Sequence, residues 1–296
     1  MRSANQPKKP QPKRDRTTCA VRPPPSTAHY WNPLMNNKDL EFFRSKRAFV
    51  CDMDGVIYHG NRLLPGATEF VDWLHRENKE FLFLTNSSER TPRELREKLN
   101  RLGIDVEEKH FYTSALATAS FLASQKAGGS AYVIGQPGLT HALYDAGYSM
   151  NDNDPDYVVV GETPEYTYAR IVRAIRHVLN GAKLIGTNPD VTGPMEEGLV
   201  PATGALMAPI ELATNAKAYY VGKPNPLIMR HALKKLGVQR EETVIVGDRM
   251  DTDIIAGIES EIATILVMSG VTNEREMRRF AYQPDGVLAG VGEIPG

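Results

Sequence analysis

The chain has few of the features that assign a sequence to a class at first sight. Only two cysteines, Cys19 and Cys51, occur among its 296 residues, which excludes a disulfide framework and is typical of a reducing compartment. No apolar run approaches the roughly 18 residues that a membrane span needs. The formal net charge of -1 gives the chain no general attraction to nucleic acid. We therefore expect a soluble cytoplasmic protein without a nucleic-acid or membrane partner.

Two common ligand motifs are also missing. The seven histidines are not spaced as zinc ligands. The pair Gly222-Lys223 lacks the upstream glycine spacing and the following Ser or Thr of a P-loop. These absences argue against a zinc site and against a P-loop nucleotide site.

The amino-terminal stretch differs from the rest in charge and composition. Residues 1–24 hold seven basic residues against one acidic residue, are rich in proline and lack the apolar core of a signal peptide. We expect residues 1–42 to be a disordered tail. Such a tail could contact RNA or anionic lipid, but a solvated leader without a partner is the favoured interpretation. Met35 lies just before the expected folded part and could be the true start.

Short apolar, β-branched runs alternate with helical patterns through the remaining chain. Because these runs are continuously apolar, we expect strands that are covered on both faces, as in a parallel sheet. Two helices have clear ends: Thr91 to Glu94 has the form of a capping box with proline at the first helical position, and Asn225-Pro226 begins a helix that Gly237 ends. The expected strands are 48–52, 81–85, 132–135, 157–160, 183–186, 218–221, 244–247 and 264–268. The pattern predicts an α/β protein.

One stretch forms a series of strands and helices of its own. It runs from about residue 131 to 215, between Gly128-Gly129 and a passage rich in proline and glycine over 188–204. A unit of roughly 85 residues can hold its own core. We therefore expect a catalytic core of residues 43–129 and 218–296, into which an α/β cap of residues 130–217 is inserted.

Polar residues follow four of the expected strands, and ligands of open parallel sheets bind outside the carboxyl ends of the strands. Asp52 and Asp54 come at the end of the first strand, where residues two apart face the same way. Two carboxylates this close need a cation, a shared proton or access to water. Taken alone, Asp-x-Asp-Gly is equally well read as a solvated turn.

The other strand ends add the remaining parts of a site. They carry Thr85 and Asn86 after the second strand, Lys223 after 218–221, and Asp248, Asp251 and Asp253 after 244–247. Carboxylates without paired histidine or cysteine favour a hard cation with oxygen ligands, for which Mg²⁺ is our expectation. Hydroxyl, amide and lysine donors beside that ion are typical of a phosphate pocket.

At these residues the sequence resembles the haloacid dehalogenase-like superfamily. Its four motifs are matched by Asp52-Met53-Asp54-Gly55-Val56, Thr85-Asn86, Lys223-Pro224, and Gly247-Asp248 with Asp253. The chain is further similar to the NagD-type phosphatases of subfamily IIA, in stretches such as Leu64-Pro65-Gly66-Ala67 and Gly186-Thr187-Asn188-Pro189-Asp190. The resemblance runs from about residue 48 to the C-terminus. It implies a Rossmann-like core with an inserted α/β cap.

The resemblance also implies an activity and a role for each residue. The protein would be a Mg²⁺-dependent phosphatase that hydrolyses small phosphate monoesters, nucleoside monophosphates or sugar phosphates, through an aspartyl phosphate. Asp52 would attack phosphorus, and Asp54 would protonate the leaving alcohol and then activate water. Mg²⁺ would lie on Asp52, Asp248 and the main-chain carbonyl of Asp54. The phosphoryl oxygens would be held by three residues, Thr85, Asn86 and Lys223.

A second group of residues is expected near the site on weaker grounds. Asp253 would orient a metal-bound water or Lys223. Arg249, Asp251 and Thr252 could line the substrate entrance. Residues 188–190 and 203–205 are candidate contacts from the cap.

Two alternatives stay open. A phosphotransferase or phosphomutase uses the same two aspartates, and a catalytically silent binding or regulatory protein could share the scaffold. A dehalogenase is disfavoured because a halide leaving group needs no proton, and so no Asp54. Neither the physiological phosphate ester nor the oligomeric state can be read from the sequence.

Overall fold

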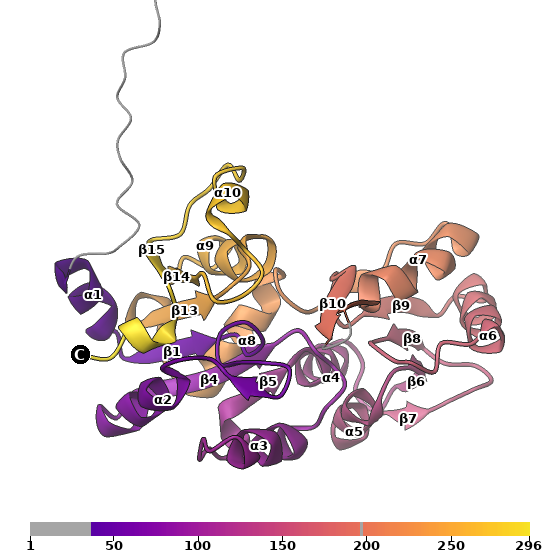
Figure 1. Ribbon diagram of the computed structural model, residues 1–296. Coiled ribbons are helices and arrows are strands. Elements are labelled where there is room, and N and C mark those ends of the chain that lie inside the picture. Colours follow the sequence, from indigo (N-terminus) through magenta and orange to yellow (C-terminus); the bar gives the residue numbers. More distant parts are fainter. Residues whose placement is uncertain (1–36, 196–197) are drawn as a thin grey trace, which may run out of the picture. The chain divides into compact units, whose positions relative to one another are not determined.

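The computed structural model describes residues 37–195 and 198–296, and most of the predicted tail, Met35 included, lies outside them (Figure 1). The chain is already helical in α1 (Asn37–Arg44), which begins inside the range 1–42 that was predicted as a tail. Leu40 and Phe43 of this helix are buried. Arg44 donates to the main-chain oxygens of Ile294 and Pro295 at 2.7 and 2.9 Å. The folded part therefore begins earlier than the sequence pattern indicated, because α1 packs against the end of the chain.

A six-stranded sheet of parallel strands forms the core, in the order β15-β14-β13-β1-β4-β5. Its central strand is β1 (Ala48–Cys51), where Val50 pairs with Ile245 on one side and with Leu82 on the other. Every residue of β1 is buried, as expected for a strand covered on both faces. The other strands are β4 (Glu80–Thr85), β5 (Phe111–Thr113), β13 (Thr243–Gly247), β14 (Ala263–Val267) and β15 (Gly286–Leu288).

Helices cover both faces of this sheet (Figure 1). Phe49 and Cys51 pack in one apolar cluster with Phe70, while Val50 packs in another with Met229, because neighbouring side chains of a strand point to opposite faces. The helices of the core are α2 (Ala67–Arg76), α3 (Pro92–Arg101), α4 (Ser114–Gln125), α8 (Pro226–Leu236), α9 (Ile255–Glu259) and α10 (Glu274–Met277). The expected α/β class is confirmed.

The cap is built around a second parallel sheet, in the order β12-β9-β8-β6-β7. Its strands are β6 (Ser130–Ile134), β7 (Ser149–Met150), β8 (Tyr157–Val160), β9 (Lys183–Gly186) and β12 (Tyr219–Tyr220). Its helices are α5 (Pro137–Asp145), α6 (Tyr168–Leu179) and α7 (Thr203–Thr214).

One expected strand belongs to a different sheet than its place in the sequence suggested. Residues 218–221 were assigned to the core, but β12 pairs with β9 of the cap. Gly186 allows this pairing, because a Cβ there would lie 2.4 Å from the ring of Tyr220. The chain therefore leaves the cap sheet just before Lys223.

Short hairpins complete the fold beside the two sheets. They are β2 (Tyr58–His59) with β3 (Arg62–Leu63), and β10 (Thr192–Met195) with β11 (Gly198–Pro201). Both predicted helix starts are confirmed: Thr91 and Glu94 form the capping box, and Asn225 caps α8. Gly237 ends α8 with a φ of +67°. Among the described residues, no helix combines the length and the apolar character of a membrane span.

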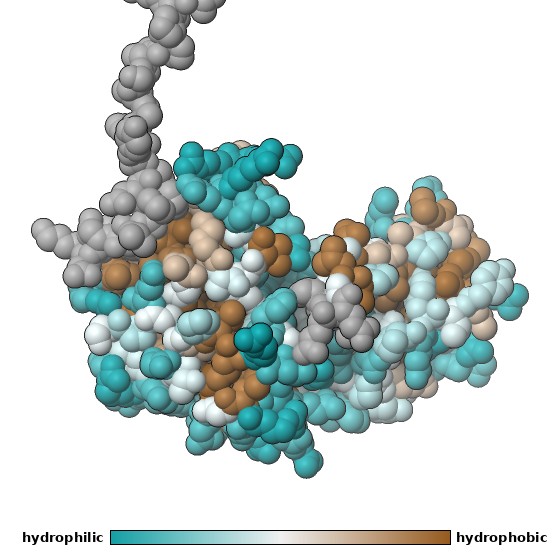
Figure 2. All heavy atoms as spheres, in the orientation of Figure 1, coloured by the Kyte–Doolittle hydropathy of each residue, from teal (hydrophilic) through white to brown (hydrophobic). Residues whose placement is uncertain are grey.

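The surface carries exposed apolar side chains mainly where the cap lies. Leu199 of β11 and Leu212 of α7 are 76% and 84% exposed. In the view of Figure 2, hydrophobic patches lie over the region of β10 and α7 and also over parts of the core, and much of the remaining visible surface is hydrophilic.

Candidate active site

The first element of the site is the end of the central strand. The N–H of Asp52 donates to the carbonyl of Val246 at 2.8 Å, which extends the pairing of β1 and β13 by one residue. The chain then turns at Gly55, whose φ is +80° and where a Cβ would lie 2.5 Å from Asp248 Oδ2. A side chain at this turn would thus occupy the space of the site.

Lys223 lies at the centre of the site. Its ammonium donates to Asp52 Oδ1 at 2.7 Å, to Asp253 Oδ1 at 2.6 Å and to the carbonyl of Leu84 at 3.0 Å. All three N–H bonds are used, and the side chain is only 2% exposed. Burial by itself would lower the pKa of Lys223, but Asp253 and Asp52 outweigh it and raise the pKa above its usual range.

Three aspartates gather around this lysine. Asp52, Asp248 and Asp253 each have one carboxylate oxygen that lies within 4.8 Å of the other two. Asp248 accepts from the N–H of Val271 through Oδ2 at 2.6 Å, whereas its Oδ1 is buried without a hydrogen-bond partner among the described residues. A buried acceptor without a donor, beside two further carboxylates, fits a metal ligand. The cluster is therefore suited to a divalent cation.

The electrostatics of the cluster point the same way. Burial raises the pKa of Asp52 to about 7, against the opposing effect of Lys223. Burial, together with the charge of Asp52, raises the pKa of Asp248 to about 8. The ammonium of Lys223 pairs with Asp52 and Asp253, while Asp248 has no ion pair among the described residues, so a cation would relieve the excess negative charge.

Asp54 has more contact with solvent. Its side chain is 38% exposed, and Oδ1 lies 3.3 Å from Nδ1 of His59. Burial raises its pKa, although His59 and Lys98 act in the opposite direction. Lys98 lies with Nζ 3.5 Å from the ring centre of Tyr58. Neither His59 nor Lys98 was among the predicted site residues, and no motif marks Lys98.

Thr85 and Asn86 follow β4, as predicted, but the side chain of Asn86 is already engaged by the protein. Its Oδ1 accepts from the N–H of Lys223 at 2.8 Å, and its Nδ2 donates to the carbonyl of Lys223 at 2.9 Å. The second N–H of this amide donates to Asp190 of the cap at 3.0 Å. Thr85 Oγ1 accepts from the N–H of Ser87 at 3.1 Å. The side chain of Asn86 therefore bonds both the main-chain N–H and the main-chain carbonyl of Lys223.

Comparison with known proteins shows to which family the chain belongs. Residues 49–149 match a family of haloacid dehalogenase-like hydrolases, and residues 220–294 match a related HAD-hydrolase-like family. The dihydroxyacetone phosphatase of Corynebacterium glutamicum is 46% identical over 247 residues, which are 83% of this chain and 90% of that protein.

This chain is a haloacid dehalogenase-like hydrolase. It is similar to the ribonucleotide monophosphatase NagD of Escherichia coli, with 44% identity over 83% of this chain and 96% of that protein. The solved structure of that NagD matches with a TM-score of 0.80 and 42% identity, covering 84% of this chain and 98% of the other. The resemblance to NagD-type phosphatases is thus confirmed, with the core and inserted cap that it implied, and the hydrolase acts on phosphoric monoesters.

The loop after β13 contributes further side chains to the hydrolase. The guanidinium of Arg249 donates to both oxygens of Asp251 at 3.0 and 2.9 Å and lies 3.9 Å from Asp190. Arg249 is partly exposed and Asp251 is exposed, and their place at the substrate entrance stays a prediction. Thr252 is only 4% exposed and its hydroxyl is 3.5 Å from Asp253 Oδ2. Thr252 is part of the single π-helical turn over Met250–Ile254 and is buried there, so it lies behind the site rather than at its entrance.

Asp253 is also buried, and its bonds agree with one of its two predicted roles. Oδ1 accepts from Lys223, while Oδ2 accepts from the N–H of Arg249 at 3.2 Å. Gly247 makes room for it, because a Cβ there would lie 2.1 Å from that of Asp253. Asp253 is therefore bonded directly to Lys223, and its role in orienting that lysine stays a prediction.

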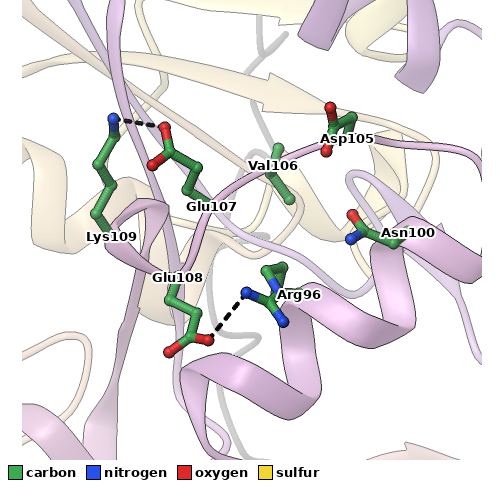
Figure 3. A pocket seen from close by; sticks show the side chains of 7 residues that line it. All are labelled: Arg96, Asn100, Asp105, Val106, Glu107, Glu108 and Lys109. Carbon is green, nitrogen blue, oxygen red and sulfur yellow. Dashed lines mark ion pairs between the residues drawn. The ribbon is translucent and has the colours of Figure 1, made fainter.

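One described pocket lies elsewhere on the hydrolase. It has a volume of about 390 Å³ and includes the ion pairs Arg96–Glu108 at 3.1 Å and Lys109–Glu107 at 2.6 Å (Figure 3). Its loop directly precedes β5, so it lies at the amino end of that strand. The aspartate cluster lies at the carboxyl ends of the parallel strands. This pocket is therefore not the active site.

Proposed function

We propose that this hydrolase removes phosphate from small phosphate monoesters with the help of Mg²⁺ and through an aspartyl phosphate. The observation that carries the proposal is the placement of Asp52 at the end of the central strand, bonded to Lys223 and clustered with Asp248 and Asp253. Such a carboxylate is placed to act as a nucleophile next to a cation site.

The reaction follows from the two aspartates of the first motif. Asp52 attacks phosphorus while the bond from phosphorus to the alcohol oxygen breaks, and Asp54 gives its proton to that oxygen. Water then attacks the aspartyl phosphate, Asp54 takes up the proton of the water, and inorganic phosphate leaves Asp52. Burial raises the pKa of Asp54, which favours a carboxyl that can carry the proton between the two steps.

The charge of the phosphoryl group has to be balanced throughout. Mg²⁺ on Asp52, Asp248 and the carbonyl of Asp54 would offset the repulsion between a carboxylate and a phosphate dianion. Lys223, the hydroxyl of Thr85 and the main-chain N–H of Asn86 would hold the phosphoryl oxygens. The ammonium of Lys223 is 2.7 Å from Asp52 Oδ1, so it can be shared between nucleophile and phosphate.

The substrate is a small phosphorylated metabolite, for which relatives supply the candidate classes. One relative is named a dihydroxyacetone phosphatase and another a ribonucleotide monophosphatase. We infer that the substrate is either a sugar phosphate or a nucleoside monophosphate. Cys51 is free and buried, which fits a protein that acts in a reducing cytoplasm.

Phosphate release from 4-nitrophenyl phosphate and from a panel of sugar and nucleoside monophosphates tests the proposal. We expect turnover that needs Mg²⁺ and that Asp52→Asn lowers by at least about 10³-fold, because the neutral amide is not a nucleophile. Asp72→Asn is the control, since Asp72 is exposed on α2. Full activity of Asp52→Asn would sink the mechanism.

A further inference from the structure

The loops that join cap and core carry a chain of contacts that ends at Lys223. We propose that Asp190 of the cap is a positioning residue, which holds Asn86 so that Asn86 holds Lys223 in the arrangement needed for catalysis. The inference rests on the proposed function and assigns to a cap residue a part in the chemistry at the core.

The side-chain amide of Asn86 uses its oxygen and both of its N–H bonds within the protein. A primary amide has one carbonyl oxygen and two N–H bonds. Here the oxygen accepts from Lys223, one N–H donates to the carbonyl of Lys223, and the other donates to Asp190. Gly222 packs against this amide, since a Cβ there would lie 2.7 Å from Asn86 Oδ1. Rotation of the amide would break every one of these bonds.

The main chain that leads to Lys223 is bonded to the cap. The N–H of Val221 donates to the carbonyl of Gly186 at 3.1 Å, and the N–H of Gly222 donates to the carbonyl of Thr187 at 2.7 Å. These bonds continue the pairing of β12 with β9, so the main chain before Lys223 is attached to the cap. The ammonium of Lys223, by contrast, contacts Asp52 and Asp253 of the core. Lys223 therefore spans the two parts.

Asp190 is itself held in place by hydrogen bonds that its main chain makes within the cap. Its N–H donates to Asn188 Oδ1 at 3.1 Å, and its carbonyl accepts from the N–H of Gly204 at 2.8 Å. Asn188 donates to the carbonyl of Asn86 at 2.7 Å. The cap thus contacts Asn86 at both its main chain and its side chain. A carboxylate acceptor makes the side-chain bond stronger than a neutral one would be.

The consequence is a link between the position of the cap and the geometry of the nucleophile. With Asp190 in contact, the amide of Asn86 is oriented and Lys223 is held 2.7 Å from Asp52. Without that contact, the amide loses the acceptor for one N–H and can turn away from Lys223. Substrate turnover would then depend on contact of the cap, although Asp190 does not touch the leaving group.

Steady-state kinetics of Asp190→Ala and Asp190→Asn in the full chain test the link. We expect kcat to fall by about 10- to 100-fold in Asp190→Ala and by less in Asp190→Asn, which keeps an acceptor oxygen. The factor should be equal for 4-nitrophenyl phosphate, a triose phosphate and a nucleoside monophosphate. A factor that changes with the leaving group would overturn the positioning role, because it would mean that Asp190 contacts substrate.

Asp152→Ala is the matched control. Asp152 is also a cap aspartate paired with an arginine, 2.8 Å from Arg173, but it precedes β8 and lies away from Asn86. Thermal unfolding of each variant checks folding. We expect Asp152→Ala to retain the activity of the unchanged protein.

Amide hydrogen exchange at Lys223, followed by NMR, tests the same link without any turnover. The N–H of Lys223 is bonded to Asn86 Oδ1, so Asp190→Ala should speed its exchange by about tenfold or more, and Asp152→Ala should not. Unchanged exchange in Asp190→Ala overturns the inference. If the unchanged protein hydrolyses no phosphate ester, the proposed function fails, and the exchange result still decides whether Asp190 holds Lys223.

Discussion

At the scale of single residues, the site depends on how closely the main chain approaches Asp248. A Cβ at Gly270 would lie 2.0 Å from Asp248 Oδ2 and 2.5 Å from its Cγ. Gly55, in the first motif, also lies close to this carboxylate, because a Cβ there would be 2.5 Å from Asp248 Oδ2. Asp248 is thus clamped between two loops, which leaves its unpaired Oδ1 as the atom available to a cation.

Gly270→Ala should therefore displace Asp248 and weaken the metal site. We expect the Mg²⁺ concentration for half-maximal activity to rise by at least about tenfold, as happens when the support of a ligand is lost. Titration of activity with Mg²⁺ measures the change. Gly290→Ala is the control, because nothing lies within 4 Å of a Cβ there. Equal Mg²⁺ requirements in the two variants would contradict this account of Asp248.

At the scale of elements, α1 shows how a short helix can belong to the core without a visible motif. Phe43 is 2% exposed and packs in the cluster on one face of the core sheet, whereas the neighbouring Phe42 is 51% exposed. Lys79 donates to the carbonyl of Arg44 at 2.6 Å and joins the end of α1 to the loop before β4. The helix is therefore part of the folded unit.

Phe43→Ala should lower the free energy of unfolding by about 3 to 5 kcal/mol, since it leaves a cavity in the core. Phe42→Ala should cost less than about 1 kcal/mol, because that ring is half exposed. Denaturant unfolding at a constant Mg²⁺ concentration measures both values. If the two variants were equally stable, α1 would not be packed as the structure has it.

At the scale of the whole molecule, the buried carboxylates couple stability to pH and to metal. Asp52 and Asp248 have pKa values raised to about 7 and about 8, while in the unfolded chain both would lie near 3.8. The folded state then binds more protons than the unfolded state, so stability falls as pH rises through this range. The pKa of His110 is lowered to about 4, so this residue makes stability rise with pH. That effect is confined to pH values below 6.5, the ordinary pKa of the group.

Between pH 6.5 and 8 the metal-free protein should therefore lose stability, and Mg²⁺ should restore more of it at pH 8 than at pH 6.5. Thermal unfolding with a chelator and with Mg²⁺ at both pH values measures this. Asp248→Asn should show a weaker dependence on both pH and Mg²⁺. A metal-free protein that becomes more stable over the same pH range would contradict the assignment.

The sequence by itself determined the features that depend on neighbours along the chain. The spacing of Asp52 and Asp54, the capping box at Thr91 and the helix stop at Gly237 were predicted because they follow from strand alternation and from helix ends. The parallel sheet was predicted for the same reason, since continuously apolar strands need cover on both faces. These features need no knowledge of distant contacts.

Only the tertiary structure decided which distant groups meet. Asn86 faces Lys223, 137 residues away, and Asp190, 104 residues away, so that its side-chain amide is engaged by a lysine and an aspartate. The strand before Lys223 joined the cap because Gly186 leaves room for Tyr220, and Thr252 is buried within a π-helical turn. Each outcome depends on packing and hydrogen bonding between segments that lie far apart in the sequence. Local spacing carries no information about such pairs.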